Sequence, residues 1–179
     1  TFKEVSNPEG KLIKRFEVIT PILQSDGVLN LCKLKTHLFM HMTGAVKNSF
    51  GAIPGLSKPG YHAKLADTQH FADMLIDLSN FVKPRLSIMD AVVAMEGEGP
   101  NNGDPRHVGL ILASVNPLAL DVVAGEILGI DRLQNPVLMA ASARGFGPTS
   151  LEDVELLGVD KSDLRVPDFK LPSTIYGMG

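Results

Sequence analysis

Residues 86–117 read LSIMDAVVAMEGEGPNNGDPRHVGLILASVNP, and this stretch decides the fold. Its two apolar runs, Leu86–Met95 and Val108–Val115, each have the length and composition of a strand. The Gly- and Asn-rich segment between them, Glu96–His107, reads as a loop that is too short for the helical crossover that parallel neighbours require. We therefore expect these strands to form an antiparallel hairpin within the main sheet.

The rest of the chain alternates strand-like and helix-like segments. We expect strands at 16–20, 28–35 and 154–157, helices at 43–51, 67–81, 117–128 and 136–144, and a loop over 51–63. Asn116-Pro117 and Asn135-Pro136 each offer an N-cap followed by proline at the first helical position. This order predicts an α/β domain, a three-layer sandwich around a mixed, mainly parallel sheet that contains the hairpin.

Composition excludes several classes of protein. The chain has 179 residues, 44% of them apolar, and a net charge of −3, which is typical of a folded domain and not of a disordered or nucleic-acid-binding segment. The single cysteine, Cys32, excludes an internal disulfide, a CxxC zinc site and a self-contained iron–sulfur cluster. The apolar runs are too short to span a bilayer and no secretory signal pattern is present. We expect a cytoplasmic protein with neither a nucleic-acid nor a membrane partner.

Basic and polar side chains gather around one predicted strand end and the helix that follows it. The candidate ligand-binding residues are Lys35, Thr43, Lys47, Asn48, Lys58 and His62, with His37 as a candidate catalytic residue. Lysines beside the free N–H groups of a helix N-terminus suit a phosphate or carboxylate. The alternative is that the lysines are solvated surface residues and that Thr43 only caps the helix. A Walker loop is absent, which disfavours nucleotide hydrolysis of that type.

A second group is acidic: Asp90, Glu96, Glu98 and Asp104. Carboxylates on a Gly-rich loop can bind a hard cation such as Mg²⁺ or Ca²⁺, or the segment can be a flexible polar loop. A transition-metal site from His37, His62 and a carboxylate is a further alternative, so the metal stays unknown. Asp90 lies within an apolar strand, where its carboxylate needs a bend, a cationic partner or a functional role.

Three blocks together resemble one prokaryotic family, the domain of unknown function 362. They are residues 33–37 with 43–48, Asp90 with 96–100, and residues 112–124, and the likeness covers roughly residues 28–158. The resemblance implies frequent fusion to a ferredoxin-type domain, so any [4Fe–4S] cluster lies in a separate or fused domain. It also implies that residues 1–179 are the C-terminal part of the family domain, a single-domain fragment with an exposed sheet edge and a tendency to form homo-oligomers.

Two functions remain open, and whether the chain is an enzyme stays undecided. In the first, Lys35, Lys47 and the 43–45 amides bind a small anion, Glu96 and Asp90 bind a cation or act as acid and base, and His37 shuttles a proton. In the alternative, the chain is a non-catalytic module that docks a ferredoxin-like iron–sulfur partner. The first requires that the Lys35 strand end lies at the Glu96 end of the sheet; otherwise the site splits in two.

Overall fold

The computed structural model describes residues 1–177. Its strands form a two-stranded sheet, β1–β2, and a four-stranded sheet in the order β4-β3-β5-β6. The strands are β1 (Phe2–Ser6), β2 (Arg15–Ile19), β3 (Leu29–His37), β4 (His41–Thr43), β5 (Leu86–Glu98) and β6 (Asn102–Ser114). The helices are α1 (Thr20–Gln24), α2 (Ala45–Asn48), α3 (Lys58–Lys64), α4 (Thr68–Val82), α5 (Pro117–Leu128) and α6 (Pro136–Ala143); short 3₁₀ turns include η1 (Ser49–Ala52) and η5 (Ser173–Tyr176).

The four-stranded sheet is mixed, as the hairpin predicts. β5 and β6 pair antiparallel from Ser87 opposite Ser114 to Glu98 opposite Asn102. β3 and β5 pair in parallel, whereas the β3–β4 pair is antiparallel. The prediction of a mainly parallel sheet is therefore wrong. Only β3 and β5 are joined through intervening helices, and the other neighbours are connected by short turns that impose an antiparallel direction.

The β5–β6 hairpin is longer than predicted. Both strands continue through the Gly- and Asn-rich segment, and the turn is confined to residues 99–101, with a cis Gly99-Pro100 bond. The loop expected over 96–107 is therefore a pair of strand extensions. Composition was misleading there because its polar residues are paired with the C-terminal segment, as Glu98 is with the backbone N–H of Ser173.

Three other local predictions differ from the structure, the first of them only at its ends. Thr43 lies in β4, and the helix expected over 43–51 is a short α2 followed by η1, because Gly44 has an extended backbone (φ −121°, ψ −162°) and is itself the N-cap. The expected loop over 51–63 contains α3, whose first turn carries a proline, where the fixed φ favours a helix. Residues 154–157 are irregular, because they run beside β6 without pairing with it.

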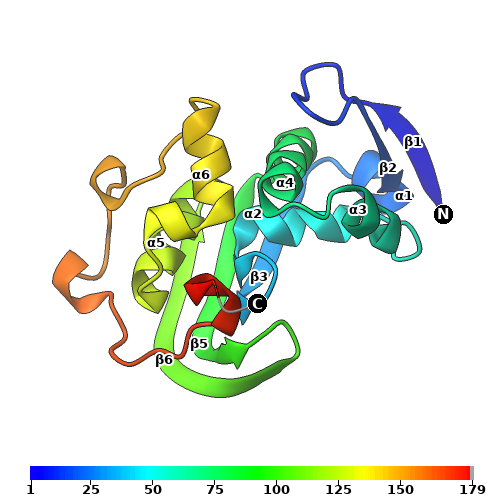
Figure 1. The fold of residues 1–179 in the computed structure, drawn as a ribbon. Coiled ribbons are helices and arrows are strands. Elements are labelled where there is room, and N and C mark those ends of the chain that lie inside the picture. Colours follow the sequence, from blue (N-terminus) through cyan, green and yellow to red (C-terminus); the bar gives the residue numbers. More distant parts are fainter. Residues whose placement is uncertain (178–179) are drawn as a thin grey trace.

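The helices cover one face of the four-stranded sheet (Figure 1). α5 packs on that face, where Leu34, Met89 and Ile127 belong to one buried cluster. A second cluster joins α4, α6, α2 and the β1–β2 hairpin, with Phe16, Phe71 and Val137 among its buried members. The opposite sheet face is exposed within residues 1–177, so the predicted third layer is not observed. What the fold establishes is a mixed α/β arrangement with a separate antiparallel pair.

Candidate functional site

The predicted basic residues come together at the end of β3. Lys35 and His37 are among the last residues of this strand. Lys47 is on α2, and Lys58 and His62 are on α3. Burial is the largest cause that lowers the pKa of His37, His62 and Lys47; in addition, Lys47 lowers the pKa of both histidines, and Lys35 and Lys58 lower that of Lys47. These five residues, called the basic cluster below, are therefore close enough for their charges to interact.

The positive charge of the basic cluster is not neutralised within the described part of the chain. None of its three lysines takes part in any of the ion pairs formed among residues 1–177. Burial, together with the charges of Lys35 and Lys58, lowers the pKa of Lys47 from 10.5 to about 8. A buried ammonium group surrounded by other cations is unfavourable unless an anion joins it. The basic cluster is thus a place where a bound anion would be stabilised.

His37 is held as a neutral ring. Its Nδ1 accepts hydrogen bonds from the backbone N–H groups of Phe39 (3.1 Å) and Met40 (3.2 Å), so the ring proton of the neutral form resides on Nε2. Burial and the nearby lysines, first Lys47 and then Lys35, lower the pKa of His37 to about 3. At neutral pH the ring offers an Nε2–H donor and has no free lone pair with which to take up a proton.

Aromatic rings position the α3 side of the cluster. The His62 ring stacks on Phe71 with centroids 4.6 Å apart, and it meets Phe50 edge to face at 5.7 Å. Lys58 Nζ lies 5.6 Å from the centroid of the Phe50 ring, within the range of a cation–π contact. Sequence reasoning missed this support because the two phenylalanines are distant in sequence from each other and lie in core positions of η1 and α4.

Thr43 and Asn48 have different surroundings. Thr43 pairs directly opposite Lys35 in the β3–β4 ladder, so both side chains lie on one face. Its hydroxyl is buried and has no hydrogen-bond partner among residues 1–177. Asn48 instead donates to the side chain of Asn30 (2.7 Å) and to the carbonyl of Leu31 (2.9 Å). Thr43 thus has a buried hydroxyl that is not used within the described fold, whereas Asn48 ties α2 to β3.

The N-terminus of α2 is occupied. The carboxylate of Asp121, on α5, accepts hydrogen bonds from the backbone N–H groups of Ala45 and Val46 (3.1 Å for Val46). A side chain at Gly44 would collide with this carboxylate, since a Cβ there would lie 2.1 Å from Oδ1. Burial raises the pKa of Asp121 to about 7, although its two N–H bonds act in the opposite direction. The Ala45 amide that the sequence offered for anion binding is therefore already used within the fold.

The acidic group does not converge on the basic cluster. Asp90 is exposed and pairs with Lys33 at 2.7 Å, which supplies the cationic partner expected for a carboxylate in a strand. Glu96 is buried and accepts from the backbone N–H of Lys170 (3.1 Å), with the Lys170 ammonium at 3.7 Å. Glu98 and Asp104 likewise contact the C-terminal segment. Residues 1–177 contain no group of three His, Cys, Asp or Glu side chains arranged to hold a metal.

The β5–β6 turn nevertheless reaches the basic cluster through its backbone. Lys35 lies opposite Met95 in the parallel ladder, so the β3 end and the Glu96 end of the sheet are the same end. Lys35 Nζ donates to the carbonyl of Pro100 (3.3 Å). Gly99 packs so closely on Thr36 that a Cβ would lie 2.0 Å from its carbonyl oxygen. The sequence blocks therefore meet, but the turn brings a carbonyl to the lysines and not the carboxylate of Glu96.

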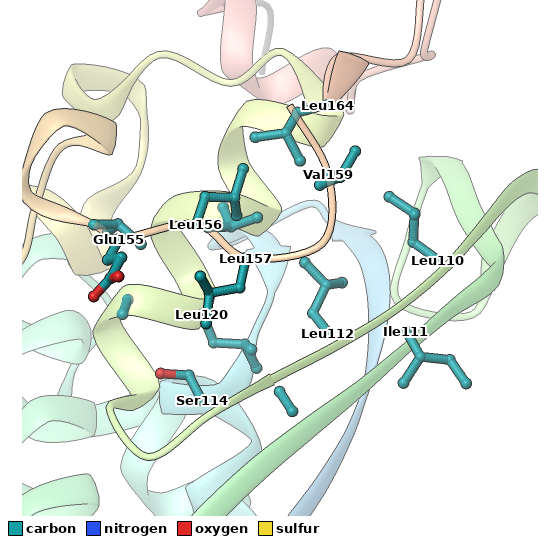
Figure 2. Close-up of a pocket in the computed structure, with 14 residues that line it drawn as sticks. Leu110, Ile111, Leu112, Ser114, Leu120, Glu155, Leu156, Leu157, Val159 and Leu164 are labelled. Carbon is teal, nitrogen blue, oxygen red and sulfur yellow. The ribbon is translucent and has the colours of Figure 1, made fainter. Parts of the chain in front are cut away.

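A separate apolar pocket of about 200 Å³ lies between β6, α5 and residues 154–159 (Figure 2). Leu110, Leu112, Leu120 and Leu156 are among the residues that line it. None of the basic-cluster residues lines this pocket. It is a gap between β6 and an unpaired segment of the chain, on the side of the sheet that α5 covers.

Comparison with known sequences gives the family. The model of the domain of unknown function DUF362 matches residues 1–126. The chain belongs to this family. The resemblance drawn from the sequence is thereby confirmed, although the match starts earlier and ends earlier than residues 28–158. The DUF362 match includes the β1–β2 hairpin and the strands β3 and β4, which carry Lys35, His37 and Thr43. It ends within α5.

One curated relative is the thylakoid-associated protein sll1697 of Synechocystis sp., which is 40% identical over 154 residues. The alignment covers 86% of this chain and 48% of the relative, so the chain spans about half the relative's length. No solved structure matches the chain. Among the described residues, no helix combines the length and apolarity needed to cross a membrane.

Proposed function

We propose that this DUF362 chain binds a small anionic compound, such as a phosphate or a carboxylate, at the basic cluster. The observation that carries the proposal is the set of three lysines with no carboxylate partner among residues 1–177, one of them half-buried with its pKa lowered to about 8. An anion between them would raise the pKa of Lys47, because it would oppose the effects of burial and of the two neighbouring lysines. The buried Thr43 hydroxyl, opposite Lys35, would donate a further hydrogen bond.

The proposed roles follow from the protonation states. Lys35, Lys47 and Lys58 supply the charge, and His37 supplies an Nε2–H donor in place of the proton shuttle that its sequence position suggested. Glu96 and Asp90 each have structural partners, so we assign them no acid–base role in this proposal. Divalent metal assistance is left out of this proposal, because the neutral His37 ring has no free lone pair and the neighbouring lysines would repel a cation.

Thermal unfolding with and without ligand tests the proposal. Inorganic phosphate and succinate are compared with sodium chloride at equal ionic strength, so that general screening is matched. At a hundred times the dissociation constant, binding adds about 2.7 kcal/mol, which for a chain of this size raises Tm by about 5–10 °C. Lys47→Met should abolish the shift. Lys3→Met, which removes an equal charge from the exposed β1 strand, should keep it.

A second candidate is docking of an iron–sulfur electron-transfer partner. What favours it is that part of the basic cluster, including His62 on α3, is open to solvent and would suit an acidic protein surface. The same melts separate the two candidates: a Tm that no small anion shifts, in wild type as in Lys47→Met, contradicts the first and favours the second. A cytoplasmic location is likewise a proposal, to be weighed by cell fractionation against the thylakoid association that the relative's name gives.

A further inference from the structure

The exposed face of the four-stranded sheet is unusually apolar. Strand partners share a face, so Leu31 lies beside Ile88, and Ile88 beside Ala113. Leu29, Leu31 and Ile111 are exposed to 65%, 68% and 71%. Val93, farther along β5, adds another exposed apolar side chain. These residues, together with Lys33 and Asp90, are called the open face below.

The pleat of β6 separates the open face from the α5 side. Leu110 and Leu112 point toward the pocket beneath residues 154–159; Ile111 also lines this pocket, but its side chain points to the other side of the strand (Figure 2). The burial of β6 alternates accordingly, with Leu110 and Leu112 half-buried and Ile111 exposed. A strand that is apolar in both directions is typical of a sheet that is covered on both faces.

The charges on the open face are self-complementary. Asp90 and Lys33 are strand neighbours joined by an ion pair at 2.7 Å among these apolar residues. Lys35, farther along the same side of β3, reaches the β5–β6 turn, where its Nζ donates to the carbonyl of Pro100. A surface with one positive and one negative group at its centre attracts neither a basic nor an acidic partner. It does fit its own copy, because a two-fold axis between the two residues brings each lysine against the other copy's aspartate.

We propose that the open face is the contact surface of a homodimer, in which two copies of this chain pack sheet against sheet. Leu31 and Ile111 of each copy would lie at the centre of the contact, about 10 Å from the facing sheet. Lys35 follows Lys33 on the same side of β3 and lies at the edge of this contact, whereas Lys47 and Lys58 lie on α2 and α3. The proposal does not rest on anion binding.

Sedimentation equilibrium over a concentration series tests the homodimer. We expect a monomer–dimer equilibrium for the wild-type chain. Ile111→Lys should weaken it at least tenfold, because a charge would be buried in the contact. Leu56→Lys is the matched control: Leu56 is 98% exposed and precedes α3, outside the open face, so its variant should dimerise as wild type does. Far-UV circular dichroism of each variant checks that the chain remains folded.

Charge exchange makes the test specific to the proposed axis. Lys33→Asp alone places two like charges together in each copy and across the interface, and should weaken the dimer. Lys33→Asp combined with Asp90→Lys restores both contacts and should recover it. A wild-type chain that is monomeric at every concentration overturns the proposal, and so does a dimer that Ile111→Lys leaves unchanged, since either result assigns the open face to another occupant.

Discussion

Two charged clusters in this chain are built on opposite principles. At the junction of α4, α6 and the β1–β2 hairpin, the Asp77 carboxylate accepts hydrogen bonds from three consecutive backbone N–H groups, Lys11 to Ile13, and from the Arg144 guanidinium. Every charge there has a partner. At the end of β3, three lysines and two histidines gather with no carboxylate among them. The first arrangement stabilises the fold, and the second gathers positive charge that no carboxylate among residues 1–177 neutralises.

The pKa values express the same difference. Burial alone would raise the pKa of Asp77, but the N–H groups of Ile13 and Lys11 and the Arg144 side chain outweigh it, and the pKa is lowered. Burial lowers the pKa of Lys47 to about 8, and the neighbouring Lys35 and Lys58 lower it in the same direction. The buried charge of Asp77 is therefore stabilised by its hydrogen-bond partners, whereas the lysines around Lys47 add to the free-energy cost of burying its charge.

Removing Asp77 should have the largest effect. Asp77→Ala leaves the Arg144 guanidinium, 5% exposed, without its closest partner and leaves three backbone N–H groups unsatisfied. Breaking a buried ion pair in this way costs about 3–5 kcal/mol. Urea unfolding at pH 7 measures it. Asp73→Ala is the control, because Asp73 is less buried and its carboxylate lies 3.5 Å from the same guanidinium, so its loss should cost clearly less.

Asp121 is intermediate between the two clusters, since its buried carboxylate has N–H partners but no cationic partner among residues 1–177. Asp121→Asn keeps the shape, yet its amide nitrogen meets one of the two N–H groups of α2, which should cost about 1–3 kcal/mol. The folded pKa of about 7 exceeds the ordinary 3.8, so the folded chain binds the proton more tightly. The contribution of Asp121 to stability should therefore fall as pH rises from about 4 to about 7.

Urea unfolding across this pH range tests that sign. In Asp121→Asn the decline between pH 4 and 7 should be reduced, because the group that titrates in the wild type is gone. A wild-type curve and a variant curve that run parallel over the whole range would show that Asp121 stays ionised throughout. The two backbone N–H groups would then suffice to hold a buried carboxylate without a cation.

The sequence predicts the starts of α5 and α6 well, but it does not predict the contact between Asp121 and α2. The Asn-Pro pairs before α5 and α6 are local signals, and both helices begin where predicted, with Asn116 and Asn135 accepting the cap hydrogen bonds. The grouping of Lys35 with Lys47 also follows from one short connection. The contact between Asp121 and the α2 amides joins positions 76 residues apart along the chain. No local sequence pattern predicts this contact. The sequence therefore predicts free N–H groups at the N-terminus of α2, where the fold places the Asp121 carboxylate.

The three-layer arrangement is not confirmed, for a similar reason. The apolar runs of β3 and β5 indicate a sheet that is buried on both sides, and the sequence offers enough helices to cover it. The helices instead gather on one side, where α4 and α6 build a second core with the β1–β2 hairpin. Pattern specifies how many elements exist, but tertiary packing decides which face each helix covers. The open face follows from that choice.

Replacing Lys47 should stabilise the fold, in contrast to the losses at Asp77 and Asp121. Lys47→Met keeps the length of the side chain and removes a charge that burial and two other lysines oppose, so stability at pH 7 should rise by about 1–3 kcal/mol. The pKa of Lys47 in the folded chain is about 8, below the ordinary 10.5. Between these two pH values the unfolded chain therefore binds the Lys47 proton more tightly than the folded chain does. Wild-type stability should therefore rise with pH from about 8 to about 10.5.

Urea unfolding of the wild type and of Lys47→Met, at pH 7 and at pH 10.5 without added anions, measures the difference in their free energies of unfolding. It should be largest at pH 7 and nearly closed at pH 10.5. Saturating phosphate at pH 7 should also narrow it, because the anion stabilises only the wild type. A Lys47→Met variant that is less stable than wild type at pH 7 would mean that Lys47 contributes to packing more than its charge costs.

The smallest effect is expected for a cluster that is paired but exposed. Lys33 and Asp90 form an ion pair at 2.7 Å, with side chains 42% and 55% exposed. Solvent screens such a pair, and ordering two mobile side chains offsets most of the attraction. Lys33→Met should therefore change Tm by about 2 °C or less, measured by circular dichroism at a dilution where the chain is monomeric. A larger decrease in Tm would mean that the Lys33–Asp90 pair holds β3 against β5. Burial would then not be what makes the Asp77 cluster stabilising. A small change, beside the large one at Asp77, would show that pairing stabilises this fold only where the partners are also buried.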